Sequence, residues 1–175
     1  MGSDKAALAS LIRDVPDFPQ PGIVFKDLTP LLADPAAFRD VIDQFVEAAA
    51  DLDIDAVVGI EARGFVLGAP VAYQIDAGFV PARKAGKLPL ATRAVTYDLE
   101  YGTATIELHA DAFGPGDRVL IVDDVLATGG TAAATIELVR GMGATVVAVH
   151  VLLELGMLDG RAALGDTPVW TMLTA

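Results

Sequence analysis

Two neighbouring carboxylates, Asp123 and Asp124, stand just before a turn of small residues that ends at Thr131. A glycine-rich turn that opens a helix offers free backbone N–H groups and the positive end of a helix dipole, and both suit a phosphate. Carboxylates instead accept hydrogen bonds from hydroxyls and attract Mg²⁺. The combination favours a ligand with hydroxyls beside a phosphate, such as a ribose 5-phosphate bearing a metal. The structural alternative is a capped strand–helix turn with a solvated acidic end.

The segments around this turn predict an α/β fold. Val119–Val122 is a short apolar run, typical of a buried parallel strand, and the helix-prone residues 132–140 follow the turn. In such sheets ligands bind beyond the carboxyl ends of the strands. Neither a Walker A motif nor G-x-G-x-x-G is present, which argues against an NTPase and a dinucleotide-binding fold.

The order of strand, turn and helix recurs earlier, with a strand over 55–60 and a helix over 65–73. Arg63 then falls at the end of a strand, where its guanidinium could bind phosphate through a planar fork of donors. The alternative is a surface salt bridge from Arg63 to Glu61.

A basic cluster follows the predicted strand 77–82. Residues 83–87 hold three of the chain's twelve Lys and Arg residues, in a sequence whose net charge is −12. Such a cluster suits a mobile arm for a polyphosphate, with Gly86 as its flexible point, although a solvated loop is the simpler interpretation. The acidic balance argues against nucleic acid as a partner.

Three further segments bear on the site. Residues 15–30 contain four prolines yet many apolar side chains, which predicts an ordered loop; it either pins the amino-terminal helix or covers a flat ligand with Phe25. Residues 95–100 and 104–108 alternate in polarity and predict a β-ribbon, with Glu100 on its wet face. Pattern alone favours a solubilising role for Glu100. His150, inside an apolar strand, is predicted to be a satisfied core histidine.

Length and composition limit the broad class. At 175 residues the chain is expected to form one domain. The absence of Cys excludes disulfides and thiolate metal sites. No charge-free run is long enough to span a membrane, and the amino terminus does not resemble a secretory signal, so we expect a cytoplasmic protein.

Several motifs resemble one family. Val122–Thr131 resembles the phosphoribosyl-pyrophosphate (PRPP) signature of the phosphoribosyltransferases, which does not specify the acceptor base. Phe18–Leu32 and Tyr97-x-Leu-Glu-Tyr-Gly102 resemble the adenine-specific members of that family. The resemblance spans about residues 8–173. It implies the type I phosphoribosyltransferase fold in a single domain over 1–175: a mostly parallel sheet flanked by helices, an amino-terminal hood over 1–34 that contributes to the base pocket, and a flexible β-ribbon loop.

The resemblance also implies an activity, in which adenine and PRPP give AMP and pyrophosphate in purine salvage. Magnesium would be held mainly by PRPP and water, with no direct protein ligand, and a homodimer is expected. The implied roles are catalysis by Glu100; ribose and 5′-phosphate binding by Asp123, Asp124, Ala127, Thr128, Gly129, Gly130 and Thr131; pyrophosphate binding by Arg63, Arg83 and Lys87, the last two in their own or a neighbouring subunit's site; and adenine binding by Val24, Phe25 and Lys26.

Two alternatives stay open at this point. The acceptor could be hypoxanthine, guanine or xanthine. Alternatively, the protein could be a regulator that senses PRPP without catalysis. Such a regulator would be expected to carry a DNA-binding segment and a basic surface.

Overall fold

The computed structural model describes residues 5–98 and 102–175. The chain divides into two compact units, Met1–Gln44 and Phe45–Ala175. Helix α3 (Pro35–Ala49) begins in the first unit and ends in the second. A single domain over the whole chain stays a prediction.

The first unit contains a hairpin where the sequence predicted an ordered loop. It holds α1 (Lys5–Ser10), β1 (Arg13–Pro16), β2 (Val24–Asp27) and α2 (Thr29–Ala33), and β1 pairs with β2 in antiparallel register. The loop prediction was wrong for the six residues of 15–30 that lie in these two strands, because Pro16 falls at the end of β1 and Pro19 and Pro21 fall in the connection rather than at central strand positions. The rings of Phe18 and Phe25 meet edge to face, with centroids 5.3 Å apart.

An Asp followed by Pro is typical of a helix start, and α3 begins at this pair, Asp34–Pro35. One carboxylate oxygen of Asp34 accepts hydrogen bonds from the backbone N–H groups of Ala36 and Ala37, both at 2.9 Å. Pro35 occupies the first helical position, where a missing N–H costs nothing.

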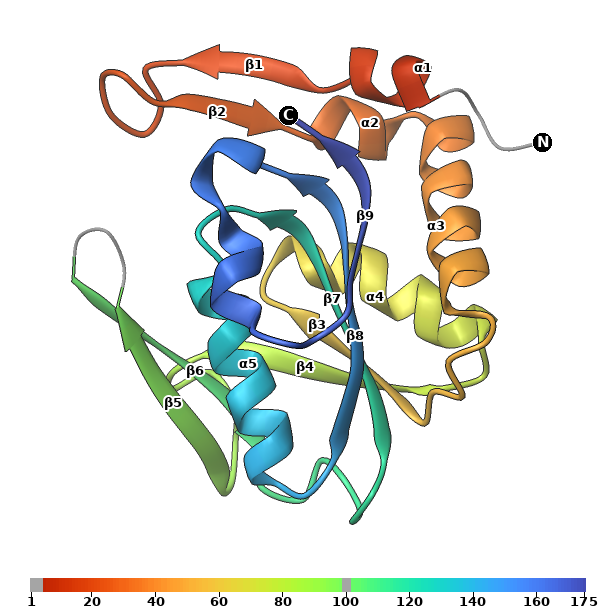
Figure 1. Ribbon diagram of the computed structural model, residues 1–175, viewed down its shortest axis with the longest axis vertical. Helices are drawn as coiled ribbons and strands as arrows, with labels where there is room; N and C mark the ends of the chain where they lie inside the picture. The colour runs from red at the N-terminus through yellow and green to blue at the C-terminus, as the bar shows by residue number, and fades with distance from the viewer. Residues whose placement is uncertain (1–4, 99–101) are drawn as a thin grey trace. The chain divides into compact units, whose positions relative to one another are not determined.

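The second unit is built on a seven-stranded, mostly parallel sheet, which confirms the predicted fold class (Figure 1). Its strands lie in the spatial order β5 (Thr92–Asp98), β6 (Thr103–His109), β4 (Gly78–Lys84), β3 (Ala56–Ile60), β7 (Arg118–Leu126), β8 (Thr145–Glu154) and β9 (Val169–Thr174). Strands β4, β3, β7, β8 and β9 pair in parallel, and β6 is antiparallel to both β4 and β5. The β5–β6 pair is the predicted ribbon.

Helices α4 (Arg63–Gln74) and α5 (Gly130–Gly141) cover the two faces of this sheet (Figure 1). Gly68 of α4 approaches the side chain of Val122, whereas Ile121 belongs to the buried cluster that contains Ala132 and Ile136 of α5. Neighbouring strand residues point to opposite faces, so β7 is buried on both sides, as its apolar sequence predicts. Two short 3₁₀ helices, η1 (Gly156–Leu158) and η2 (Gly160–Leu164), connect β8 to β9.

Two strands extend beyond the predicted ends. Strand β7 continues through Asp123 and Asp124 to Leu126, because its pairing with β8 persists to Glu154. Strand β4 continues to Lys84, because Arg83 and Lys84 pair with Glu107 and Ile106 of β6. The acidic pair and Arg83 are therefore strand residues rather than turn or loop residues. Within the described ranges, no helix combines the length and apolarity needed to cross a membrane.

His150 lies in the core as predicted, but it is not satisfied. It is 2% exposed, its ring packs beside Phe45 and Trp170, and none of the described residues is a hydrogen-bond partner for its Nδ1. Burial lowers the pKa of His150 from 6.5 to about 4. The folded protein therefore holds this imidazole neutral.

Stability should fall on acidification because of this residue. His150 binds a proton below about pH 6.5 in the unfolded chain, but only below about pH 4 in the folded chain. The free energy of unfolding therefore falls by roughly 3 kcal/mol as the pH drops through this window. His150→Phe should flatten the decline in denaturant titrations at pH 7, 6, 5 and 4.5. His109→Gln, at the chain's only other histidine, is the matched control. An unchanged slope for His150→Phe would contradict the assignment.

Candidate active site

The turn between β7 and α5 forms a pocket from nearly all the residues that the sequence assigned to the phosphoribosyl group. Gly129 precedes α5 with a φ of +83°, a conformation that only glycine adopts freely. One pocket is lined by Asp123, Val125, Leu126, Ala127, Thr128, Gly129, Gly130, Thr131, Ala132 and Val151. A carboxylate, two hydroxyls and the amino end of α5 thus meet around one space, as a phosphorylated sugar requires.

The η1–η2 segment packs closely against this turn, a contact that the sequence did not reveal. A side chain at Gly129 would collide with the carbonyl oxygen of Gly160, and one at Gly160 would collide with that of Ala127. Arg161 holds the segment in place through a two-nitrogen contact with Glu154, with its closest distances at 2.7 Å. Its guanidinium lowers the pKa of Glu154. Leu158-Asp-Gly-Arg161 resembles the family's carboxyl-terminal segment, but this resemblance does not indicate contact with the turn.

The two aspartates play different structural parts. Asp124 forms an ion pair with Arg63 Nε, and its backbone N–H donates to Asp123 Oδ1 at 2.8 Å. Burial, reinforced by the negative charge of Asp124, raises the pKa of Asp123. Asp123 lines the donor pocket, whereas Asp124 holds the first residue of α4. The alternative prediction, a salt bridge from Arg63 to Glu61, is wrong, because the ion-pair partner of Arg63 is Asp124.

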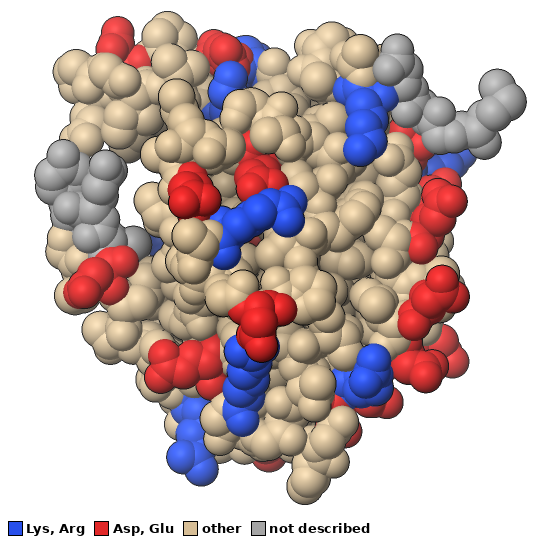
Figure 2. All heavy atoms as spheres, in the orientation of Figure 1, with Lys and Arg blue, Asp and Glu red and all other residues tan. Residues whose placement is uncertain are grey.

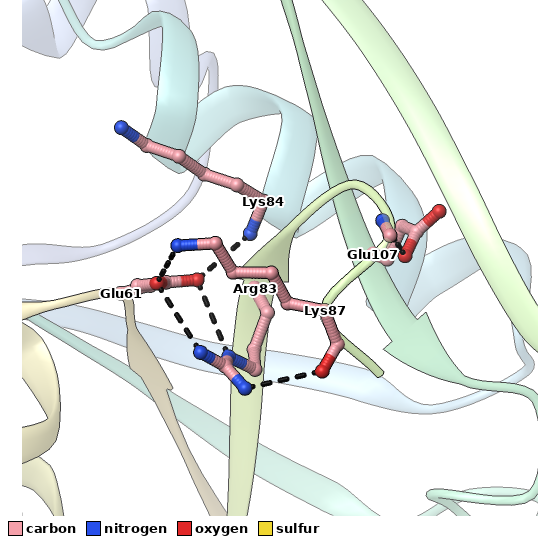
Figure 3. Close-up of polar contacts among 6 residues, drawn as sticks. Glu61, Arg83, Lys84, Lys87 and Glu107 are labelled. Carbon is pink, nitrogen blue, oxygen red and sulfur yellow. Dashed lines mark hydrogen bonds and ion pairs between the residues drawn. The ribbon is translucent and has the colours of Figure 1, made fainter. Parts of the chain in front are cut away.

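Glu61 instead gathers the basic cluster (Figure 3). Its carboxylate accepts from Lys87 Nζ at 2.9 Å, from the Arg83 guanidinium at 3.3 and 3.4 Å, and from the backbone N–H of Lys84 at 3.0 Å. The hydrogen bond from Lys87, with those from Arg83 and Lys84, lowers the pKa of Glu61 to about 2 although burial opposes the shift. Arg83 and Lys87 are therefore brought together, as predicted, but around an internal carboxylate at the end of β3.

The residues assigned to adenine all lie on β2 in the first unit. The side chain of Val24 is exposed, and Phe25 packs on Phe18. Lys26 Nζ pairs with Asp14 at 2.7 Å, so its ammonium group is already engaged within the hairpin. The family resemblance assigns residue 26 a contact to the base through its main chain, which stays a prediction.

The predicted catalytic residue, Glu100, lies outside the described residues. The structure does describe Tyr97, three residues earlier on β5, whose hydroxyl lies 2.9 Å from Thr131 Oγ1. In the sequence Tyr97 is the first residue of the Tyr97–Gly102 motif, which indicates no role for its hydroxyl. A hydrogen bond to the pocket's own threonine makes it a residue of the site.

The charged groups fit magnesium only if the substrate supplies most of its ligands. Across residues 5–98 and 102–175, no three His, Asp or Glu side chains gather closely enough to hold a metal ion. Asp124 is occupied by Arg63, and Asp123 is the one carboxylate that lines the donor pocket. This donor set suits an ion coordinated mainly by phosphate, hydroxyl and water oxygens.

Comparison with known proteins identifies the family. A family model described as "Phosphoribosyl transferase domain" matches residues 28–166. Adenine phosphoribosyltransferase of Thermobifida fusca (strain YX) is 58% identical over 175 residues, which cover 99% of each chain. The crystal structure of adenine phosphoribosyltransferase from Thermoanaerobacter pseudethanolicus superposes with a TM-score of 0.96 at 45% identity, covering 98% of this chain and 100% of the other.

A second solved structure was determined with ligands. The Saccharomyces cerevisiae adenine phosphoribosyltransferase, complexed with adenine and an imino-altritol bisphosphate, superposes with a TM-score of 0.93 at 41% identity. The two chains are covered to 99% and 100%. With this likeness over the whole length, the chain belongs to the adenine phosphoribosyltransferase family of phosphoribosyl transferases.

Proposed function

We propose that this protein transfers the phosphoribosyl group of PRPP to adenine, giving AMP and pyrophosphate. The observation that carries the proposal is the pocket that Asp123 and the turn Ala127–Thr131 line together. The names of relatives that match almost the full chain support adenine as the acceptor.

The donor's ribose 5-phosphate would occupy this pocket. Backbone N–H groups of residues 127–131 and the hydroxyls of Thr128 and Thr131 would bind the phosphate, favoured by the helix dipole. Asp123 would accept hydrogen bonds from the ribose hydroxyls, and Asp124 would do so once Arg63 exchanges it for the pyrophosphate. Their negative charge would also stabilise the positive charge that develops on the sugar at the transition state.

The leaving group would be neutralised by Arg63, Arg83 and Lys87. N9 of adenine forms a bond to C1 of the ribose, and the electron pair of the broken C1–O bond leaves with pyrophosphate. Magnesium, bound mainly by PRPP oxygens and water, would supply further neutralisation of the pyrophosphate charge. Arg83 and Lys87 would have to exchange Glu61 for this anion.

The acceptor base would be recognised by the β2 hairpin. Phe25 would stack on the flat face of adenine, while Val24 and Lys26 would contribute main-chain contacts. Glu100 would hydrogen-bond or exchange a proton at N7, which makes N9 a better nucleophile.

We also propose a homodimer located in the cytoplasm. Large apolar side chains are exposed on neighbouring elements, with Val66 and Tyr73 on α4, Phe79 on β4, and Leu90 beyond it. Large apolar side chains exposed to solvent are candidates for burial in a subunit interface. On the face drawn in Figure 2, basic side chains are separated by acidic and uncharged ones, which with the net charge of −12 disfavours nucleic acid as a partner.

The test is an assay of base specificity. The purified protein, PRPP and Mg²⁺ are incubated with adenine, hypoxanthine, guanine or xanthine, and each nucleotide product is quantified. We expect AMP as the dominant product. Preference for another base would redirect the assignment within the family, and no nucleotide from any base would overturn it.

A further inference from the structure

We propose that Tyr97 is a positioning residue for the donor's 5′-phosphate, because it orients the Thr131 hydroxyl from outside the pocket. This inference rests on the proposed function, which places the phosphate at residues 127–131. It assigns a purpose to a contact between the β-ribbon and the turn that the catalytic scheme above does not use.

The contact is specific and partly buried. Tyr97 Oη and Thr131 Oγ1 lie 2.9 Å apart, although the two residues are 34 positions apart in sequence. The ring lies over Gly130, since a Cβ built there would meet Tyr97 Cδ2 at 3.4 Å. Tyr97 also packs against the buried cluster that lies under α5. Both the ring and the hydroxyl of Tyr97 therefore lie against the start of α5.

The direction of the hydrogen bonds follows from the donor count. A hydroxyl has one proton to donate and two lone pairs. Either hydroxyl can donate at this distance; because a phenol is the stronger donor, the proposal has Tyr97 donate to Thr131 Oγ1, which leaves the Thr131 proton for the pocket. Thr131 lines the pocket, whereas Tyr97 is not among its described lining residues. Tyr97 thus acts through Thr131, in a chain where each bond strengthens the next.

The same bond joins two parts of the site. Strand β5 ends at Asp98 and leads to Glu100 two residues later in the sequence, whereas Thr131 opens α5. Occupation of the turn by phosphate would strengthen the Tyr97–Thr131 bond and hold the base of the ribbon.

Tyr97→Phe tests the proposal, because it removes only the hydroxyl and keeps the ring on Gly130. The KM for PRPP and the dissociation constant for ribose 5-phosphate, measured by calorimetry, should each rise about fivefold. Turnover at saturating PRPP and the KM for adenine should stay within about twofold. A purely structural role would instead change all four values or lower the melting temperature without this split.

Two further variants make the test decisive. Thr96→Val removes another hydroxyl pair of the same ribbon, Thr96–Thr105 at 2.8 Å, and should leave every constant unchanged. In a Thr131→Val background, adding Tyr97→Phe should have no further effect, because the relay is already broken. An unaltered ribose 5-phosphate affinity in Tyr97→Phe, or an equal loss in the Thr131→Val background, would overturn the inference. If the parent binds ribose 5-phosphate but forms no AMP, the proposed function fails while this binding test still decides the role of Tyr97.

Discussion

Replacing Glu100 with alanine is expected to lower the turnover number with adenine by roughly 10²-fold or more. The reason is that a positioned carboxylate which exchanges a proton with the reacting base contributes about that much to a rate. The turnover number is measured at saturating PRPP and adenine. The affinity for PRPP should change little, because no donor contact is assigned to Glu100.

Two variants separate chemistry from charge. Glu100→Gln keeps a hydrogen-bonding group but cannot exchange a proton at neutral pH, so it should resemble the alanine variant if proton exchange matters. Asp111→Ala removes one exposed acidic group just after β6 and should behave as the parent. Turnover that is unchanged in Glu100→Ala would remove this residue from the mechanism.

The second large effect is expected from Asp123→Asn combined with Asp124→Asn. Hydrogen bonds to charged groups contribute about 1.5–3 kcal/mol each, so the loss of both carboxylates should weaken PRPP binding by roughly 100-fold or more. The dissociation constant for PRPP is measured by calorimetry in the presence of Mg²⁺. An unaltered constant would contradict the assignment of the pair to the ribose.

The structure shows how to divide this effect between the two residues. Asp124→Asn also deprives Arg63 of its ion-pair partner, so part of its effect would come from Arg63. Asp123→Asn leaves that pair intact and is the cleaner measure of ribose binding. Melting temperatures of both single variants show whether a loss of affinity reflects a loss of fold.

Elements with a strong local signal were predictable from sequence. The apolar run before Asp123 and the Asp34–Pro35 start of α3 gave the right elements in the right order. Element ends were less predictable where a partner far along the chain decides them. Strand β7 passes through the acidic pair only because β8 continues beside it, and the β1–β2 hairpin forms only because two short segments pair despite their prolines.

The site shows the same division. The turn Ala127–Thr131 could be predicted, since one continuous motif contains its phosphate-binding groups. The partners of Arg63 and Glu61 could not, because opposite charges at short sequence separation suggested that they pair with each other. Tyr97 and Gly160 reach the turn from distant segments, and nothing in their immediate sequence indicates that contact.

Glu61 gives the basic cluster a built-in counter-ion. Its carboxylate neutralises charge on Arg83 and Lys87, and its pKa of about 2 keeps it ionised at any physiological pH. An incoming polyphosphate would therefore enter by ion exchange rather than by capture on bare cations. The same carboxylate could retake both cations as the product anion departs, which would keep the site from holding its own product too tightly.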